Sequence, residues 1–377
     1  MSIDIRSRDK REVISTEQTE KFLSTGVFAR PLLKMMVDKH ASDLFFTPNS
    51  VVKIKIEGEL SSANNDVLSA KAIEKVALGM MTPAQLKTYR EEGEVEYGWS
   101  ETGMGRFRVN VFSQRGNPAL VLRYMTPELR SLDQIGMPAV LKTLALGRQG
   151  LVLVAGANGV GKSTTVAAMV DYRNEHCADH ILTIEDPIEF LHTNKKSIVN
   201  QREVGTDVQS YQHALKNAMR AAPNMVVIGE IRDRETMEAA LLFAATGHLC
   251  IASIHANNSA EAIERACNLF PRDQNNQVLL DLSQYLRAVV AQRLVRGVDK
   301  RRVAAVEVLI NSPYVQELVK KGDISALKEA IQKSAERGMQ SFDTALEALV
   351  KSGKVEKAEA VAFADSRGHL EARLSFG

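Results

Sequence analysis

One glycine-rich segment, residues 156–163, constrains this chain more than any other feature. It reads Gly-Ala-Asn-Gly-Val-Gly-Lys-Ser, follows the apolar run 151–154 and precedes the helix-like run 164–170. A strand, a loop of the form G-x-x-x-x-G-K-[ST] and a helix in this order make a phosphate-binding P-loop, whose backbone N–H groups turn toward the phosphates. Lys162 could reach the β- and γ-phosphates, and the Ser163 hydroxyl could ligate Mg²⁺. The sequence therefore predicts a nucleotide site formed by Gly156, Ala157, Asn158, Gly159, Val160, Gly161, Lys162, Ser163 and Thr164.

Composition limits the class of protein. Of the 377 residues, 45% are hydrophobic and 25% charged, and the formal net charge is +2. These values are typical of a soluble globular protein with two or three domains, and they do not indicate nucleic-acid binding. The three cysteines fit no metal-binding spacing, so reduced and mostly buried thiols in a cytosolic protein are expected. No apolar run approaches the ~20 residues of a transmembrane helix.

The N-terminal part of the chain predicts an arm and a small domain. Residues 1–21 alternate charges without an apolar core, which excludes a signal peptide and predicts a mobile arm. Residues 22–126 predict a compact α+β domain. Its expected elements are helices near residues 28–37 and 70–81 and strands near residues 44–46, 52–56, 95–99, 107–112 and 120–124.

The rest of the chain predicts an α/β domain followed by helices. Pro127 and Pro138 bracket an expected linker, residues 127–138. Residues 139–310 alternate strands with helices, which predicts a parallel sheet covered on both faces. Residues 311–377 are helical and polar, with one amphipathic helix around residues 342–349 and another over residues 355–364. The predicted fold class is therefore α/β, with a smaller α+β domain before the P-loop domain and helices after it.

Two further strands end in carboxylates. The run 181–189 ends in an acidic cluster, and because ligands bind at the carboxyl ends of strands in open α/β sheets, Glu185 or Glu189 could activate water. A solvated loop after a buried strand is the simpler interpretation of this run by itself. The apolar strand 225–228 ends in Gly229 and Glu230, where many P-loop enzymes carry an aspartate in place of the glycine. Glu230 is thus the residue expected to hold Mg²⁺ or its water.

Histidines and arginines supply weaker candidates. His248 and His255 stand at the two ends of an expected strand, so they are poor partners for one metal. They could sense the nucleotide state or be ordinary buried histidines. Arg106 and Arg108 share one face of a strand, with Arg115 just beyond it. This basic face could meet a γ-phosphate from a neighbouring subunit, or it could simply be exposed.

The order of the motifs resembles a known superfamily. The P-loop, Thr-Ile-Glu-Asp-Pro-Ile-Glu at 183–189, Ile-Gly-Glu-Ile-Arg-Asp at 228–233 and the Gly-His and His-Ala-Asn runs at 247–248 and 255–257 resemble the Walker A, Asp box, Walker B and His box of type II/IV secretion ATPases. Further runs look like the type IV pilus retraction ATPases of the PilT/PilU family, over about residues 25–365. These are residues 41–44, 106–112, 199–205 and 292–295.

A missing cysteine motif and several residues that differ from the family pattern indicate which type of ATPase the chain resembles most. The chain has no C-x-x-C, whereas extension and type II secretion ATPases commonly carry a tetracysteine zinc site, so a retraction-type motor is favoured. The sequences of residues 228–231 and 313–320 most resemble the PilU type. Asn158 and Val160 lack the hydroxyls usual in the family's loop, which predicts altered nucleotide affinity or turnover.

The resemblance implies roles for the candidate residues. It makes Lys162 the phosphate clamp, Ser163 a Mg²⁺ ligand, Glu189 the catalytic carboxylate and Glu230 the Walker B group. His248 and His255 would couple nucleotide state to domain movement. The face formed by Arg106, Arg108 and Arg115 would contact a neighbour's nucleotide.

The resemblance also implies an assembly. It suggests a cytoplasmic homohexamer with PAS-like and RecA-like domains, hydrolysing ATP to depolymerise pili through an inner-membrane platform protein, beside a PilT-type partner ATPase. Two alternatives remain: an ATP-binding adaptor for a partner motor, and a DNA-translocating relative, for which the sequence offers neither a basic pore nor a DNA-binding appendage.

Overall fold

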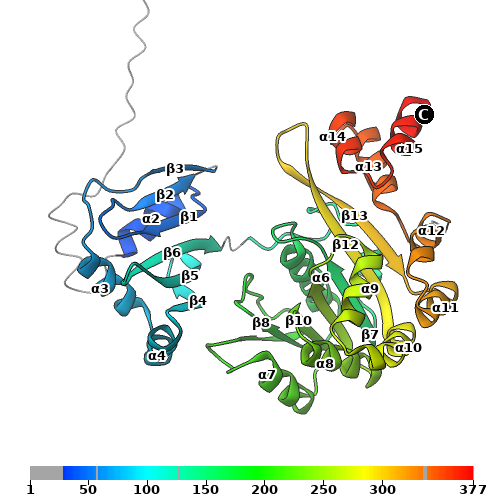
Figure 1. Ribbon diagram of the computed structural model, residues 1–377, viewed down its shortest axis with the longest axis horizontal. Helices are drawn as coiled ribbons and strands as arrows, with labels where there is room; N and C mark the ends of the chain where they lie inside the picture. Colours follow the sequence, from blue (N-terminus) through cyan, green and yellow to red (C-terminus); the bar gives the residue numbers. More distant parts are fainter. Residues whose placement is uncertain (1–28, 57, 126–127, 334–337, 377) are drawn as a thin grey trace, which may run out of the picture. The chain divides into compact units, whose positions relative to one another are not determined.

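The structure is a computed structural model that describes residues 29–56, 58–125, 128–333 and 338–376. The described residues form two compact units, which divide between residues 125 and 128 (Figure 1). Each unit is described by itself below. The mobile arm expected over residues 1–21 lies outside the described residues. Among the helices of the described part, none combines the length and the apolar character needed to cross a bilayer.

The first unit is an antiparallel sheet with helices. Its strands have the order β3-β2-β1-β6-β5-β4. The elements are α2 (Ala29–Asp38), β1 (Asp43–Phe46), β2 (Lys53–Ile56), β3 (Glu59–Ser62), α3 (Ala70–Met80), α4 (Pro83–Glu92), β4 (Glu94–Glu101), β5 (Gly105–Gln114) and β6 (Asn117–Met125). Apolar side chains of α2, α3 and the alternating positions of the sheet form one core, which confirms the expected α+β domain.

Two elements of this unit escaped the sequence analysis. Strand β3 is short and mostly exposed, so it carries no apolar pattern. Helix α4 does carry a local signal: Thr82 and Gln85 form a reciprocal capping box, Pro83 occupies the first turn, and Gly93 ends the helix at φ 82°. The capping residues, more than the weak apolar periodicity, define this helix.

The second unit is built on a mixed, mainly parallel sheet. Its strand order is β13-β12-β7-β11-β10-β8-β9, and neighbouring strands are parallel except for the β12–β13 pair. The strands are β7 (Gly150–Ala155), β8 (His180–Glu185), β9 (Ile198–Glu203), β10 (Met225–Ile231), β11 (Leu249–Ile254), β12 (Leu286–Arg296) and β13 (Arg302–Ile310). The inner strands are buried on both faces and are therefore continuous apolar runs, which is the pattern that predicts them from the sequence.

Helices cover both faces of this sheet. Val152 and Val154 pack with α5 and α6 on one face, while Leu151 and Leu153 pack with α7–α10 on the other. The helices are α5 (Val140–Ala145), α6 (Lys162–His176), α7 (Tyr211–Ala218), α8 (Arg234–Ala245), α9 (Ser259–Asn268), α10 (Asn275–Tyr285), α11 (Pro313–Lys321), α12 (Ser325–Lys333), α13 (Phe342–Lys351), α14 (Lys357–Phe363) and α15 (Arg367–Phe376). The α/β class and the helical C-terminal region are confirmed (Figure 1).

The expected linker has structure of its own. Within residues 128–138, Leu132 and Met137 are buried among the side chains of α5, α6 and the sheet. This stretch therefore packs with the second unit. The finer domain boundaries, at residues 22, 126, 138 and 310, stay predictions.

Candidate functional site

The P-loop joins β7 to α6 at the carboxyl edge of the sheet. Gly159 and Gly161 adopt φ values of 77° and 90°, a left-handed conformation that glycine tolerates without strain. Gly161 precedes α6 directly, and no side chain caps the helix, so its first N–H groups point into the loop. These features fit a phosphate group, because unpaired amides and the positive end of the helix dipole meet there.

Close packing shapes the loop from behind. A Cβ on Gly156 would collide with the Val160 side chain and lie 3.1 Å from the carbonyl oxygen of Gln292 on β12. Val160 therefore packs against Gly156, in a position where the family usually carries a hydroxyl. Asn158, the other departure from the family pattern, is exposed.

Lys162 lies folded back over the loop. Its Nζ donates hydrogen bonds to the carbonyl oxygens of Gly156 and Ala157, at 2.9 and 3.0 Å. Burial lowers the pKa of Lys162, and the carboxylates of Glu230 and Glu189 oppose that shift. Both carboxylates thus lie within electrostatic range of the lysine. The structure brings together these three residues, which the sequence placed on three separate segments.

The two acidic candidates after β8 have different environments. Glu185 accepts hydrogen bonds from Thr183 Oγ1 and Gln201 Nε2, at 2.6 and 3.1 Å. Burial raises its pKa, and these two bonds oppose the rise. The Glu185 carboxylate is therefore occupied by hydrogen bonds to β8 and β9. Glu189 is half-buried, and its carboxylate is one of the two that act electrostatically on Lys162.

Strand β9 holds the segment that carries Glu189. The buried Glu203 carboxylate accepts from the Ile188 N–H at 3.0 Å and from Thr206 Oγ1 at 3.0 Å. Gln201 donates to the Phe190 carbonyl oxygen at 2.8 Å and accepts from the His192 N–H at 2.8 Å. The residues on both sides of Glu189 are thus hydrogen-bonded to β9. In the sequence, residues 199–205 resemble the family but carry no pattern that indicates this role.

Glu230, the last residue but one of β10, lies near a tyrosine that no sequence pattern indicates. Its Oε2 lies 2.7 Å from Arg232 Nε. A Cβ on the neighbouring Gly229 would lie only 2.7 Å from the Tyr211 hydroxyl of α7. Burial raises the pKa of that hydroxyl, and Asp186, Glu185 and Glu230 add to the rise, so it remains protonated. A protonated hydrogen-bond donor therefore stands among the carboxylates at this edge.

The two histidines lie at opposite edges of the sheet. Ile254 pairs with Ala155, and the Gly156 N–H donates to the Ile254 carbonyl oxygen at 3.3 Å, so His255 follows beside the P-loop. His248 precedes the same strand, roughly 20 Å away at the rise of a β-strand. There its Nδ1 contacts Thr246 Oγ1 at 3.1 Å and the Phe243 carbonyl oxygen at 3.2 Å. The structure does not bring His248 to the P-loop of its own chain.

The arginines of the first unit occupy one face of β5. Arg106 Nη1 donates to Ser100 Oγ at 3.2 Å, and Arg108 forms an ion pair with Glu96; both partners lie on β4. Phe107 and Val109 alternate with them and are buried on the other face. Arg115 is exposed in the β5–β6 turn, at φ 48°.

The donor set fits magnesium better than zinc. Among the described residues, no three His, Cys, Asp or Glu side chains come together as a metal cluster. Mg²⁺ keeps several waters and binds proteins through one or two oxygen ligands plus substrate phosphates. Ser163 in the first turn of α6 and Glu230 are oxygen donors of this kind, so they could hold Mg²⁺ together with a bound nucleotide.

Comparison with known proteins identifies the family. A family model described as "Type II/IV secretion system protein" matches residues 19–340. The chain belongs to this family. The type IV pilus ATPase PilU of Pseudomonas aeruginosa is 44% identical over 347 residues, which cover 92% of this chain and 91% of PilU. PilT of the same organism, named as a type IV pilus retraction ATPase, is 36% identical over 329 residues, 87% of this chain and 96% of PilT.

A solved relative supports the fold of this family member. A crystal structure of the pilus retraction motor PilT with bound ADP matches with a TM-score of 0.83 and 35% sequence identity, covering 90% of this chain and 98% of that chain. The resemblance to the PilT and PilU ATPases that was inferred from the motifs is thereby confirmed.

Proposed function

We propose that this chain is an ATP-hydrolysing motor subunit that drives retraction of type IV pili, of the PilU type, and so supports twitching motility. The observation that carries the proposal is the convergence of Lys162, Glu189 and Glu230 at the carboxyl edge beside the P-loop. The similarity to PilU and PilT over most of the chain agrees with it.

Each residue has a physical role in this proposal. Lys162 exchanges its two carbonyl partners for phosphate oxygens when ATP binds, while the loop amides hold the remaining charge. Glu189 orients and deprotonates the attacking water. Ser163 and Glu230 would hold Mg²⁺, which would supply positive charge next to the phosphates. His255, beside the loop, reports the presence of nucleotide to the following segment.

The proposed assembly places further residues between subunits. In a homohexamer, Arg106 and Arg115 of one subunit would contact the nucleotide of its neighbour, and His248 would act at a subunit boundary, because neither its own P-loop nor its own Mg²⁺ ligands are near it. The ring would work at the cytoplasmic face of the inner membrane, through a pilus platform protein and a PilT-type partner ATPase. Nothing in this scheme requires nucleic acid.

Steady-state ATP turnover by the purified full chain tests the proposal. Glu189→Gln should lose about 10²–10⁴-fold in turnover while it retains nucleotide binding, because it removes a general base and keeps the side chain's shape. Lys162→Ala should fail at binding. Glu235→Gln, which changes an exposed carboxylate in the first turn of α8, is the matched control and should leave turnover unchanged.

Two outcomes would change the conclusion. Normal turnover in Glu189→Gln would remove Glu189 from the catalytic role. Binding of ATP without turnover in the unmutated chain would favour an accessory subunit that works as an adaptor for a partner motor, consistent with the altered loop residues Asn158 and Val160. Loss of twitching on deletion of the gene, restored by the unmutated chain, tests the part played in retraction.

A further inference from the structure

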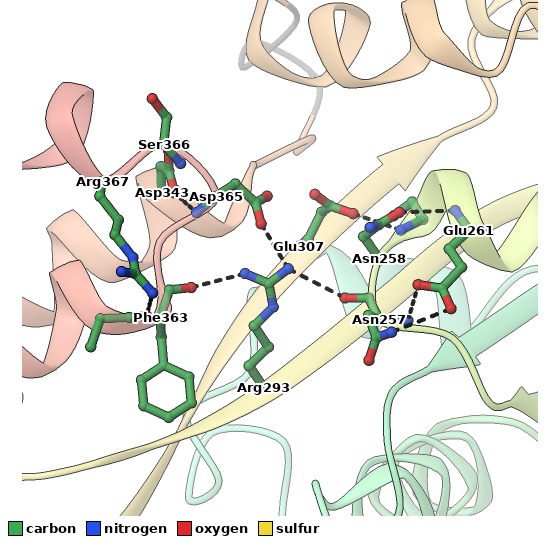
Figure 2. Close-up of polar contacts among 12 residues, drawn as sticks. Asn257, Asn258, Glu261, Arg293, Glu307, Asp343, Phe363, Asp365, Ser366 and Arg367 are labelled. Atoms are coloured by element: carbon green, nitrogen blue, oxygen red, sulfur yellow. Dashed lines mark hydrogen bonds and ion pairs between the residues drawn. The ribbon is translucent and has the colours of Figure 1, made fainter.

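Arg293 on β12 joins two segments that are distant in the sequence (Figure 2). Its Nη1 donates to the Phe363 carbonyl oxygen at 2.9 Å, and its Nη2 lies 2.7 Å from Asp365 Oδ1, in the connection between α14 and α15. Nη2 also donates to the Asn257 carbonyl oxygen at 3.5 Å. The guanidinium group stacks 3.8 Å from the centre of the Phe342 ring. One planar group thus contacts both segments, more closely at Phe363 and Asp365 than at Asn257.

The first segment is the His255 loop, residues 255–258 between β11 and α9. It starts beside the P-loop, as the pairing of Ile254 with Ala155 shows. The Asn257 N–H donates to Glu261 Oε2 at 2.9 Å, and the Ser259 N–H donates to the buried Glu307 carboxylate at 2.7 Å. Polar contacts therefore define the position of this loop, and Arg293 contacts its middle.

The second segment belongs to the C-terminal helices α13–α15. The buried Asp343 carboxylate accepts from the N–H groups of Asp365 and Ser366, at 2.8 and 3.1 Å. Phe342 and Asp343 open α13. Phe342 stacks on the guanidinium group, and Asp343 binds the connection between α14 and α15 (Figure 2). The connection, α13 and Arg293 form one hydrogen-bonded unit.

The residue before Arg293, Gln292, contacts the helix that follows the P-loop, from the opposite face of β12. Successive side chains of a strand point to opposite faces. Gln292 donates from Nε2 to Thr165 Oγ1 at 2.8 Å, and Thr165 is buried in the first turn of α6. Two adjacent residues of β12 therefore contact, respectively, the helix that follows the P-loop and the C-terminal helices.

We propose that Arg293 is a positioning residue that couples the His255 loop to the C-terminal helices, so that nucleotide at the P-loop changes the arrangement of α13–α15. This inference rests on the proposed nucleotide site. A shift of the Asn257 carbonyl changes the orientation of the guanidinium group, and the same group holds Phe363 and Asp365. Coupling of this kind is reciprocal, so a partner bound to α13–α15 would in turn change nucleotide affinity.

Hydrogen–deuterium exchange of the full chain, with and without Mg·ADP, tests the coupling. In the unmutated chain, ADP should change the exchange rate of the Asp365 and Ser366 amides by roughly five-fold, the lower end of typical coupling between sites. Arg293→Lys keeps the charge and loses the forked donor, so it should abolish this response while protection of the P-loop amides persists. Asp365→Asn, at a partly exposed position, is a second variant with the same expected result.

The matched control and the contrary outcomes separate this inference from the proposed function. Arg296→Lys makes the same change at an exposed position of β12 and should keep the full response. Protection of the P-loop without any response at Asp365 and Ser366, or a full response in both Arg293→Lys and Asp365→Asn, overturns the coupling alone. Absence of protection at the P-loop itself overturns the nucleotide site and this inference with it.

Discussion

Gly229 gives a sharp test of how Glu230 is placed. A Cβ at Gly229 would lie 2.7 Å from the Tyr211 hydroxyl, 3.2 Å from Glu185 Cα and 3.3 Å from the Ile184 carbonyl oxygen. The hydroxyl ends a side chain that can move, but the other two atoms belong to the backbone of β8, which pairs with β10. Gly229→Ala therefore forces two paired strands apart by a few tenths of an ångström.

These contacts set the size of the expected change in unfolding free energy. Overpacking of a well-packed interior costs about 1–3 kcal/mol. The smaller conformational freedom of alanine in the unfolded chain returns about 0.4–1 kcal/mol. Gly229→Ala should thus lower the free energy of unfolding by about 0.5–2 kcal/mol. In a unit of this size, each kcal/mol lowers Tm by about 3 °C. Turnover should fall as well, because Glu230 follows directly.

Thermal unfolding of the second unit, in a double-mutant cycle with Tyr211→Phe, measures the effect. Removing the hydroxyl eliminates the closest contact, so Tyr211→Phe should recover at least about 0.5 kcal/mol in the Gly229→Ala background. Gly368→Ala, where a Cβ would meet no atom within 4 Å in α15, is the control and should be neutral or stabilising. Melting of Gly229→Ala at the temperature of the unmutated chain, or simple additivity of the two changes, would show that these contacts are not strained.

Two further predictions concern β9 and the loop that it braces. Glu203→Gln places an amide N–H₂ where a carboxylate oxygen accepts a hydrogen bond from Ile188 or Thr206. It should lower the free energy of unfolding by about 1–3 kcal/mol and reduce ATP turnover, because Glu189 lies in the segment that Glu203 holds. Unchanged melting and turnover would show that these hydrogen bonds are dispensable. Burial lowers the pKa of His192 to about 4, so between pH 6.5 and 4 the unfolded chain binds a proton that the folded chain does not. Stability should therefore fall by about 1–3 kcal/mol as the pH drops through this range, and denaturation of His192→Gln across the same range should show a smaller loss.

Local patterns in the sequence predicted the parts whose causes are local. The P-loop is encoded in eight consecutive residues, because its glycines and the start of α6 determine the conformation within a short window. Buried strands such as β7 and β11 are apolar runs, and alternating positions of β5 separate Arg106 from Phe107. Helix α4 was within reach of the same approach, since its capping residues are visible in the sequence.

Only the tertiary structure decided which side chains meet. That β9 holds Glu185, while Glu189 acts electrostatically on Lys162, depends on β9 lying beside β8 and supplying Gln201. That His255, and not His248, lies beside the P-loop follows from the parallel pairing of β11 with β7. Arg293 donates a hydrogen bond to the carbonyl oxygen of Phe363, which lies 70 residues further along the chain. The order and register of strands determine such contacts, and no window of neighbouring residues contains that information.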